Sequence, residues 1–282
     1  MNNERTMRVD FLNKPIDWDI AAWYDEMPLW SAPFGMLLLE YLPMEPGMKV
    51  LDVGCGTGFP LLELAQRLGQ SCTIVGLDPW HEAVERARQK AKAWSISNVE
   101  IIDGDAMTMP FENSNFDLIV SNLGINNLND PGSALAECYR VLKSRGQIAL
   151  TTNPCGHMSL FYDIYRTTLE EMCEIRCLEI LDEHVRHRKT EDEVSGLLAA
   201  AGFAVERVER RDYSMRFLNG SALFCHSFIR LAFLDGWRSV VTGGREKEIF
   251  DCLEHNLNRW AEDNHGLTVV VPMAYIEGRK AG

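Results

Sequence analysis

Residues 50–59, VLDVGCGTGF, constrain the fold of this chain more than any other segment. A short apolar run contains an acid, Asp52, and leads into a loop with glycines at Gly54, Gly56 and Gly58. Glycine adopts positive φ and lets the backbone approach a ligand, while the free amides at the start of a helix are hydrogen-bond donors. The segment therefore predicts a buried strand, a tight ligand-binding turn and the beginning of a helix.

Apolar runs and helical patterns alternate beyond this segment. In chain order, the strand and helix candidates are 49–54, 59–68, 72–78, 81–94, 98–105, 116–122, 131–142 and 146–152. Parallel strands connected by helices form a sheet that is covered on both faces. We therefore expect an α/β protein with a doubly wound, mostly parallel sheet.

The second half of the sequence has a different pattern. Residues 157–181 are helical in pattern, and Thr190 with Glu193 forms a capping-box signature for another helix. Strands are predicted at 203–210 and 267–278. The helical segments between these two strands are too long for a simple connection, so we expect them to cover something.

The charge of the chain narrows the class of partner. Acidic residues exceed basic ones, 41 to 28, which gives a formal net charge of −13. Such a surface repels phosphate backbones, so a nucleic-acid partner is disfavoured. The N-terminal residues lack the apolar run of a secretory signal, and no stretch reaches the about eighteen apolar residues of a membrane span. We expect a cytoplasmic protein.

The eight cysteines do not form a metal-binding pattern of the usual spacing. The nearest arrangement is Cys173, Cys177, His184 and His187, with the two cysteines on one helical face and the histidines in a loop. Structural zinc sites usually pair their ligands more closely. We therefore favour two buried thiols beside a basic segment, and expect no metal.

The glycine spacing separates two kinds of nucleotide ligand. A dinucleotide site has the fingerprint Gly-x-Gly-x-x-Gly, and its third glycine would fall at Phe59. The spacing here is Gly-x-Gly-x-Gly, preceded by an acid two residues before the first glycine. This pattern disfavours NAD.

The segment VLDVGCGTG resembles the first motif of class I S-adenosylmethionine-dependent methyltransferases. The resemblance extends over about residues 16–155, through GLDPW with Asp78, the segments 104–122 and 140–152, and the upstream segment that ends in Tyr24 and Asp25. Within this family, the chain resembles the small-molecule branch of ubiquinone/menaquinone-biosynthesis and related methyltransferases. The resemblance implies a seven-stranded Rossmann-like sheet, with helical insertions forming a cap, and S-adenosyl-L-methionine as cofactor.

The family's motifs assign roles to residues of this chain. Asp78 is expected to bind the ribose hydroxyls, Asp105 the adenine amino group, and Tyr24 is placed near the methionine carboxylate. Carboxylates also suit the ammonium, sulfonium and hydroxyl groups of the cofactor on chemical grounds alone. The cofactor-binding residues expected are Tyr24, Asp52, Gly54, Gly56, Asp78, Pro79, Asp105, Ala106 and Asn122.

The reaction makes few demands on a base, because the methyl group is already activated and the enzyme can act by proximity and orientation. Asn122, Asn126 and Asn127, which follow the fourth strand, cannot act as bases near neutral pH. His157, just after the fifth strand, is the candidate base. The expected acceptor is a small apolar or aromatic molecule, bound by Trp30, Phe224 and Phe228.

The domain boundaries follow from these assignments. We expect an N-terminal helical segment over the active site at 1–45, a cofactor-binding core at 46–155, and the rest of the sheet at 156–282, with lid insertions at about 157–201 and 214–265. The sequence leaves open an arsenite or thiol methyltransferase, and a regulatory protein that binds the cofactor without catalysis. It does not identify the acceptor atom or the oligomeric state.

Overall fold

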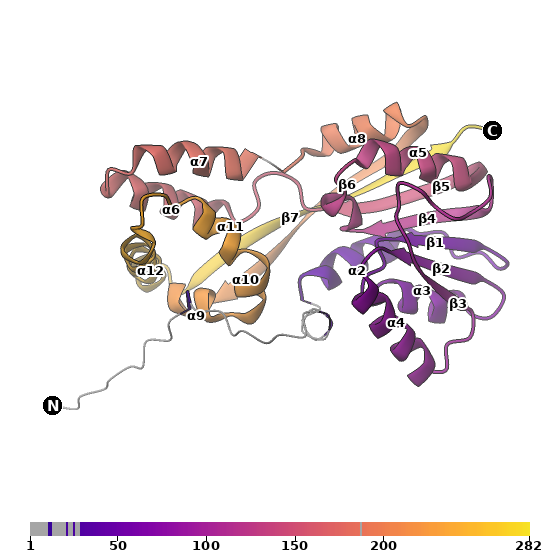
Figure 1. Ribbon diagram of the computed structural model, residues 1–282, viewed down its shortest axis with the longest axis horizontal. Helices are drawn as coiled ribbons and strands as arrows, with labels where there is room; N and C mark the ends of the chain where they lie inside the picture. Colours follow the sequence, from indigo (N-terminus) through magenta and orange to yellow (C-terminus); the bar gives the residue numbers. More distant parts are fainter. Residues whose placement is uncertain (1–10, 13–20, 22–24, 26–28, 187) are drawn as a thin grey trace. The chain divides into compact units, whose positions relative to one another are not determined.

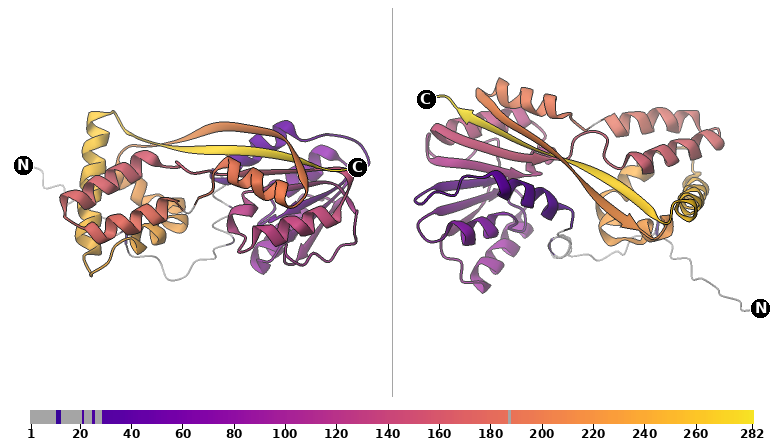
Figure 2. Two further views of the ribbon diagram at one scale, coloured as in Figure 1. Left: turned by 90° about the horizontal axis from the view of Figure 1, so that it is seen from above. Right: turned by 180° about the vertical axis from the view of Figure 1, so that it is seen from behind.

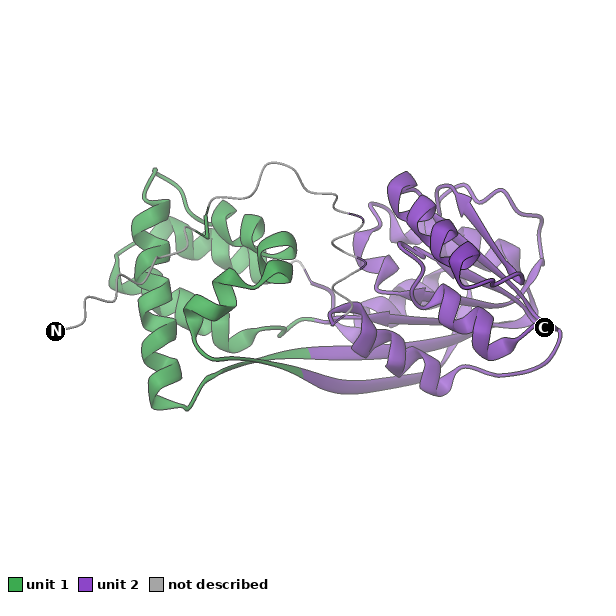
Figure 3. Cartoon of the chain, turned by 90° about the horizontal axis from the view of Figure 1, so that it is seen from below, with its two compact units in different colours: residues 1–18, 155–187, 214–271 green, residues 19–154, 188–213, 272–282 purple. Residues whose placement is uncertain are grey.

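The computed structural model describes residues 11–12, 21, 25, 29–186 and 188–282. The chain divides into two compact units, which Figure 3 shows in different colours. We call residues 19–154, 188–213 and 272–282 the sheet unit, and residues 1–18, 155–187 and 214–271 the helical unit. Each unit has residues from three separate stretches of the chain, so neither corresponds to one continuous domain.

Within the described residues, seven strands form one sheet (Figure 1). They are β1 (Lys49–Val53), β2 (Thr73–Asp78), β3 (Val99–Asp103), β4 (Phe116–Asn122), β5 (Leu142–Thr152), β6 (Phe203–Phe217) and β7 (Leu267–Lys280). Their order is β3-β2-β1-β4-β5-β7-β6, with β1 to β5 parallel and β7 antiparallel to β5. The predicted mostly parallel, doubly wound, seven-stranded sheet is confirmed.

Helices cover both faces of this sheet (Figures 1 and 2). They are α2 (Ser31–Tyr41), α3 (Leu61–Leu68), α4 (His81–Ala93), the short η1 (Gly124–Asn127), α5 (Pro131–Val141) and α8 (Glu191–Ala200). Helices α2, α3 and α4 lie on one face, and α5 and α8 on the other. Because the order reverses between β1 and β4, the carboxyl ends of these two strands form the crevice where ligands bind in such sheets.

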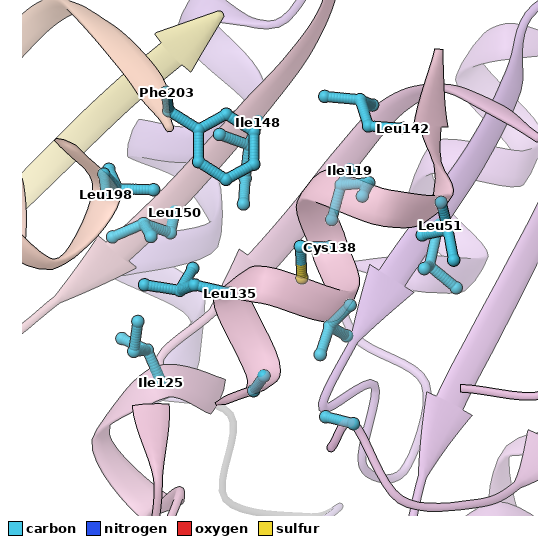
Figure 4. Close-up of a cluster of buried hydrophobic side chains, with 14 of the residues drawn as sticks. Leu51, Ile119, Ile125, Leu135, Cys138, Leu142, Ile148, Leu150, Leu198 and Phe203 are labelled. Carbon is cyan, nitrogen blue, oxygen red and sulfur yellow. The ribbon is translucent and has the colours of Figure 1, made fainter. Parts of the chain in front are cut away.

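The core on the α5 and α8 face accounts for the apolar residues Leu51 and Val53 of β1. Leu51 of β1 and Ile119 of β4 belong to a buried cluster that also contains Leu135 and Cys138 of α5 and Leu198 of α8 (Figure 4). Successive side chains of a strand point to opposite faces. Asp52, the residue after Leu51 in β1, therefore points to the face that carries α2, α3 and α4.

The helical unit has an aromatic core of its own. Its helices are α6 (Ser159–Glu171), α7 (Ile175–Arg186), α9 (Gly220–Cys225), α10 (Ser227–Ala232), α11 (Leu234–Ser239) and α12 (Glu246–Asp263). Phe224 is fully buried, its ring stacks on Phe11 at 4.6 Å, and the rings of Phe161, Trp237 and Phe250 lie within 6.2 Å. Aromatic rings at such distances contribute packing beyond the area that they bury.

Local signals predicted some helix boundaries and missed others. The capping box is present, with the Thr190 hydroxyl accepting from the Glu193 amide and the Glu193 carboxylate accepting from the Thr190 amide. The aromatic-rich segment 221–237, in contrast, is broken into three short helices at His226 and Phe233. The pattern at 157–181 is interrupted by Cys173, whose φ is +58°.

Candidate active site

The loop after β1 adopts the conformation that only its glycines allow without strain. Gly54, Gly56 and Gly58 have φ of +78°, +50° and +103°. A Cβ on Gly54 would lie 3.0 Å from Cα of Gly124, so the loop contacts the turn after β4. No atom of the described chain lies within 4 Å of the corresponding point on Gly56. The loop is therefore packed against protein on one side and open at Gly56.

Asp78 links the end of β2 to this loop. Its side chain is 9% exposed, and its two oxygens accept hydrogen bonds from the Gly56 amide at 2.8 Å and the Trp80 amide at 2.9 Å. Burial raises the pKa of Asp78, and these two N–H groups oppose the shift. Each oxygen has a second lone pair, so the carboxylate can still accept from two ligand hydroxyls.

Asp52 is the most unusual polar group of the site. It is fully buried, and neither oxygen has a hydrogen-bond partner among the residues that the structure describes. Burial, and then the nearby charge of Asp78, raises the pKa of Asp52 to about 8; the Leu61 amide, which is near but makes no hydrogen bond of normal geometry, acts in the opposite direction. A buried acid without a partner costs free energy that a cationic ligand would recover.

The ends of β2 and β3 carry the residues predicted to face adenine. Pro79 is exposed in the turn after β2. Asp105 is exposed, and one of its oxygens accepts from the Met107 amide at 2.9 Å. Ala106 is buried, and its side chain belongs to the core cluster. The structure thus places these residues on neighbouring strand ends, and their cofactor contacts stay predictions.

Both polar atoms of the Asn122 side chain, at the end of β4, are hydrogen-bonded. Its oxygen accepts from the Thr151 hydroxyl at 2.7 Å, and its nitrogen donates to the Ser31 carbonyl at 3.2 Å. An amide oxygen accepts twice and an amide nitrogen donates twice. Asn122 can therefore bind a ligand only with its second hydrogen or lone pair.

A second polar cluster lies at the end of β5, and the sequence analysis missed it. The Thr152 hydroxyl donates to Oδ1 of Asn126 at 2.5 Å, and Nδ2 of Asn126 donates to Oδ1 of Asn153 at 3.0 Å. Nη1 of Arg188 donates to the same Asn153 oxygen at 2.6 Å. Asn153 is 2% exposed, and its Nδ2 has no partner in the described part of the chain. Leaving such a donor unsatisfied costs about 1–3 kcal/mol.

Asp25 is another residue that the sequence analysis did not single out. It lies in the predicted N-terminal motif, and it pairs with Arg86 at 2.8 Å and with Lys90 on α4. The hydrogen bonds from Lys90 and Arg86 lower the pKa of Asp25 against the opposing effect of burial. Asp25 is thus ion-paired to two residues of α4. Tyr24 lies outside the described residues.

The remaining predicted residues lie in different units. Trp30, in the sheet unit, is 9% exposed and contacts Phe34 at a ring distance of 5.9 Å. His157 and Phe228, in the helical unit, are 2% and 4% exposed. The His157 ring lies 5.5 Å from Tyr162, edge to face. Their catalytic and substrate-binding roles, and that of Phe224, stay predictions.

A family model described as a methyltransferase domain matches residues 44–202. The chain belongs to this methyltransferase family. A demethylmenaquinone methyltransferase of Geobacillus is 30% identical over 174 residues, which are 58% of this chain and 74% of the relative. A ubiquinone/menaquinone biosynthesis C-methyltransferase of Ruegeria is 29% identical over 224 residues, 76% of this chain and 84% of the relative. Some demethylmenaquinone methyltransferases match over only about half of their length.

The fold of the methyltransferase is shared with solved structures. The YcgJ protein of Bacillus subtilis aligns with a TM-score of 0.58 at 19% identity, over 89% of this chain and 99% of that protein. At this identity the likeness concerns the fold. The family membership shows that the chain is an S-adenosylmethionine-dependent methyltransferase, as the resemblance of its motifs implied.

The residues at the carboxyl edge fit this cofactor. The unpartnered carboxyl of Asp52 suits a molecule with an ammonium and a sulfonium, and the open side of Gly56 admits a ligand close to the backbone. Asp78 offers free lone pairs for the ribose hydroxyls. Across the described ranges, no three His, Cys, Asp or Glu side chains form a cluster that could hold a metal ion.

Proposed function

We propose that this methyltransferase modifies a small aromatic molecule with oxygen substituents, of the hydroquinone type. The observation that supports this most is the set of buried, uncharged polar side chains at the ends of β4 and β5, namely Asn122, Thr151 and Asn153. Such groups, few in number and beside apolar side chains, orient a small organic ligand. The relatives in Geobacillus and Ruegeria are named for methylation in menaquinone and ubiquinone synthesis.

The chain's own residues would bind and align both partners. Asp52 and Asp78 hold the cofactor from the β1 and β2 ends, and Asn122 faces it from β4. When bound, the cofactor would supply an electrophilic methyl group to an electron pair of the acceptor, with the methyl–sulfur electrons remaining on sulfur and the acceptor's proton released to water. The main contribution of the protein is alignment, which is sufficient for large rate effects. His157 is the candidate base where the acceptor must lose its proton early.

The net charge of −13 supports a small molecule over a nucleic acid as acceptor. None of the helices that the structure describes is long and apolar enough to cross a membrane. We propose a cytoplasmic location for the enzyme.

The experiment is methyl transfer from cofactor labelled in the methyl group. The purified chain is offered 1,4-dihydroxynaphthalene under reducing conditions, simple phenols, amines, arsenite with a thiol, total RNA and lysate protein. We expect label in the dihydroxynaphthalene. Transfer to arsenite, RNA or protein alone would refute the proposal, and cofactor binding without transfer to any acceptor would favour a regulatory protein.

A further inference from the structure

The hydrogen-bond directions around Asn153 are determined by chemistry. Arginine only donates, so the Asn153 atom that Arg188 contacts at 2.6 Å is the oxygen. The same oxygen receives the Asn126 amide at 3.0 Å, and the Asn126 oxygen is in turn occupied by the Thr152 hydroxyl. The remaining atom of Asn153 is therefore a nitrogen with two hydrogens to donate.

This nitrogen is buried and has no acceptor within the described residues. Buried donors in proteins are nearly always satisfied, so an exception calls for a ligand oxygen or a water molecule. Arg188, bonded to the same side chain, adds a fixed positive charge beside it. The two groups together suit an oxygen atom that carries negative charge.

The position of the cluster relates it to the reaction. The strand order places β2, with Asp78 at its end, on one side of β1, and β4 and β5 on the other. Asp78 is the residue expected to bind the ribose of the cofactor. Asn153 directly follows β5, and Asn126 lies in the turn that contacts the Gly54 loop through Gly124. The cluster therefore lies on the side of the cofactor loop away from the nucleoside, where an acceptor must approach.

We propose that Nδ2 of Asn153 and the guanidinium of Arg188 bind the ionisable hydroxyl of the methyl acceptor. This rests on the proposed function, and it adds the residues that bind the phenolic or enolic hydroxyl and the form in which it is bound, the anion. A positive charge beside such a hydroxyl favours its ionised form. Arg188 and Asn153 thus raise the nucleophilicity of the acceptor, and they act as positioning residues for the oxygen.

The test measures binding without turnover, in the presence of the product S-adenosylhomocysteine. Calorimetry under reducing conditions compares 1,4-dihydroxynaphthalene with 1,4-dimethoxynaphthalene, which lacks an ionisable hydroxyl. The wild-type chain should bind the dihydroxy compound about tenfold more tightly or better, as expected for hydrogen bonds to a charged oxygen. Asn153→Asp and Arg188→Leu should reduce this ratio to about one, and Arg188→Lys should retain part of it.

The control is Asn127→Asp, which places the same extra charge on an exposed residue of the neighbouring turn. It should keep the wild-type ratio. All variants should bind S-adenosylhomocysteine like the wild type, which shows that they are folded. A merely structural role would lower both naphthalene affinities together and leave their ratio unchanged.

The outcomes separate this inference from the proposed function. The inference would be overturned if the wild type bound the dihydroxy and dimethoxy compounds with nearly equal affinity, or if its preference for the dihydroxy compound were unchanged in both Asn153→Asp and Arg188→Leu. Either result would count even if 1,4-dihydroxynaphthalene is methylated. A ratio that depends on these residues supports it, and absence of transfer would then count against the proposed function alone.

Discussion

The backbone amide of Gly56 donates a 2.8 Å hydrogen bond to Oδ2 of Asp78, across the space between the β1 loop and the end of β2. The bond joins Gly56, whose open side is expected to face the cofactor, and the acid expected to bind the ribose. The same carboxylate accepts from Trp80 at 2.9 Å. The side chain is thus oriented before any ligand binds, which reduces the cost of ordering it on binding.

Asp78→Ala should weaken S-adenosylmethionine binding by about 1–3 kcal/mol, because it removes the acceptor for the ribose hydroxyls and leaves the Gly56 amide without a partner. Calorimetric titration measures the change. The matched control is Glu82→Gln, an exposed acid in the first turn of α4, which should bind the cofactor like the wild type. Equal affinity of Asp78→Ala and the control would mean that the ribose is held elsewhere.

The raised pKa of Asp52 predicts that cofactor affinity depends on pH. The carboxyl is largely protonated below its pKa of about 8, and a cationic cofactor favours the ionised form. Binding should therefore release a proton, and affinity should rise from about pH 6 to pH 8 and level off above. Calorimetry in buffers of different ionisation heat counts the proton. Asp52→Asn, which controls for titration of the cofactor itself, should show a flatter profile; an unchanged slope would exclude Asp52 as its source.

The same acid predicts how the free protein responds to pH. The unfolded chain loses this proton above about pH 4, whereas the folded state keeps it to about pH 8. The folded state thus binds more protons in this window, and the contribution of Asp52 to stability falls as the pH rises. Asp52→Asn should remove that loss, and urea unfolding between pH 5 and 8 measures the difference. If the variant loses as much unfolding free energy between pH 5 and pH 8 as the wild type, other groups cause the loss.

Substitutions in the glycine loop can separate the effect of backbone strain on stability from the effect of a close cofactor contact on binding. Gly58→Ala should destabilise the fold, because its φ is +103° and the new Cβ would lie 3.1 Å from Leu62 and 3.2 Å from Ala87. Gly56→Ala has open space around it, so it should cost about 1 kcal/mol of stability but weaken cofactor binding strongly. Gly47→Ala, with φ +80° and no neighbour within 4 Å among the described atoms, is the control for backbone strain alone. Cofactor affinity of Gly56→Ala equal to that of Gly47→Ala would contradict a close approach.

The order of strands and helices could be predicted because it depends on local signals. Four consecutive residues of β1 are buried and three of them are apolar, and the Thr190 and Glu193 pair marks the start of α8. The breaks at His226 and Phe233 could not be predicted, because neither a proline nor a glycine stands there. Those breaks depend on packing inside the helical unit.

The site could be predicted only where it depends on strand ends. Asp52 and Asp78 follow from a motif, whereas the lack of any partner for Asp52 depends on burial. Arg188 reaches Asn153 across 35 positions of sequence, and Asp25 reaches Arg86 across 61. No motif spans those distances. The one available signal for Asn153 was its position directly after the fifth strand, near the strand end where Asn122 closes the fourth.

Phe224→Ala tests whether the Phe224 ring stabilises the aromatic core of the helical unit or binds the methyl acceptor. The ring is fully buried and stacks on Phe11 at 4.6 Å, so its removal should destabilise the protein by about 3–5 kcal/mol, with the residual cavity adding to the loss of burial. Denaturant unfolding measures the free energy. Leu218→Ala, at a residue 80% exposed, should be within about 0.5 kcal/mol of the wild type. If Phe224→Ala keeps its stability and raises the KM for the acceptor at unchanged cofactor affinity, the ring contacts substrate and the core assignment is wrong.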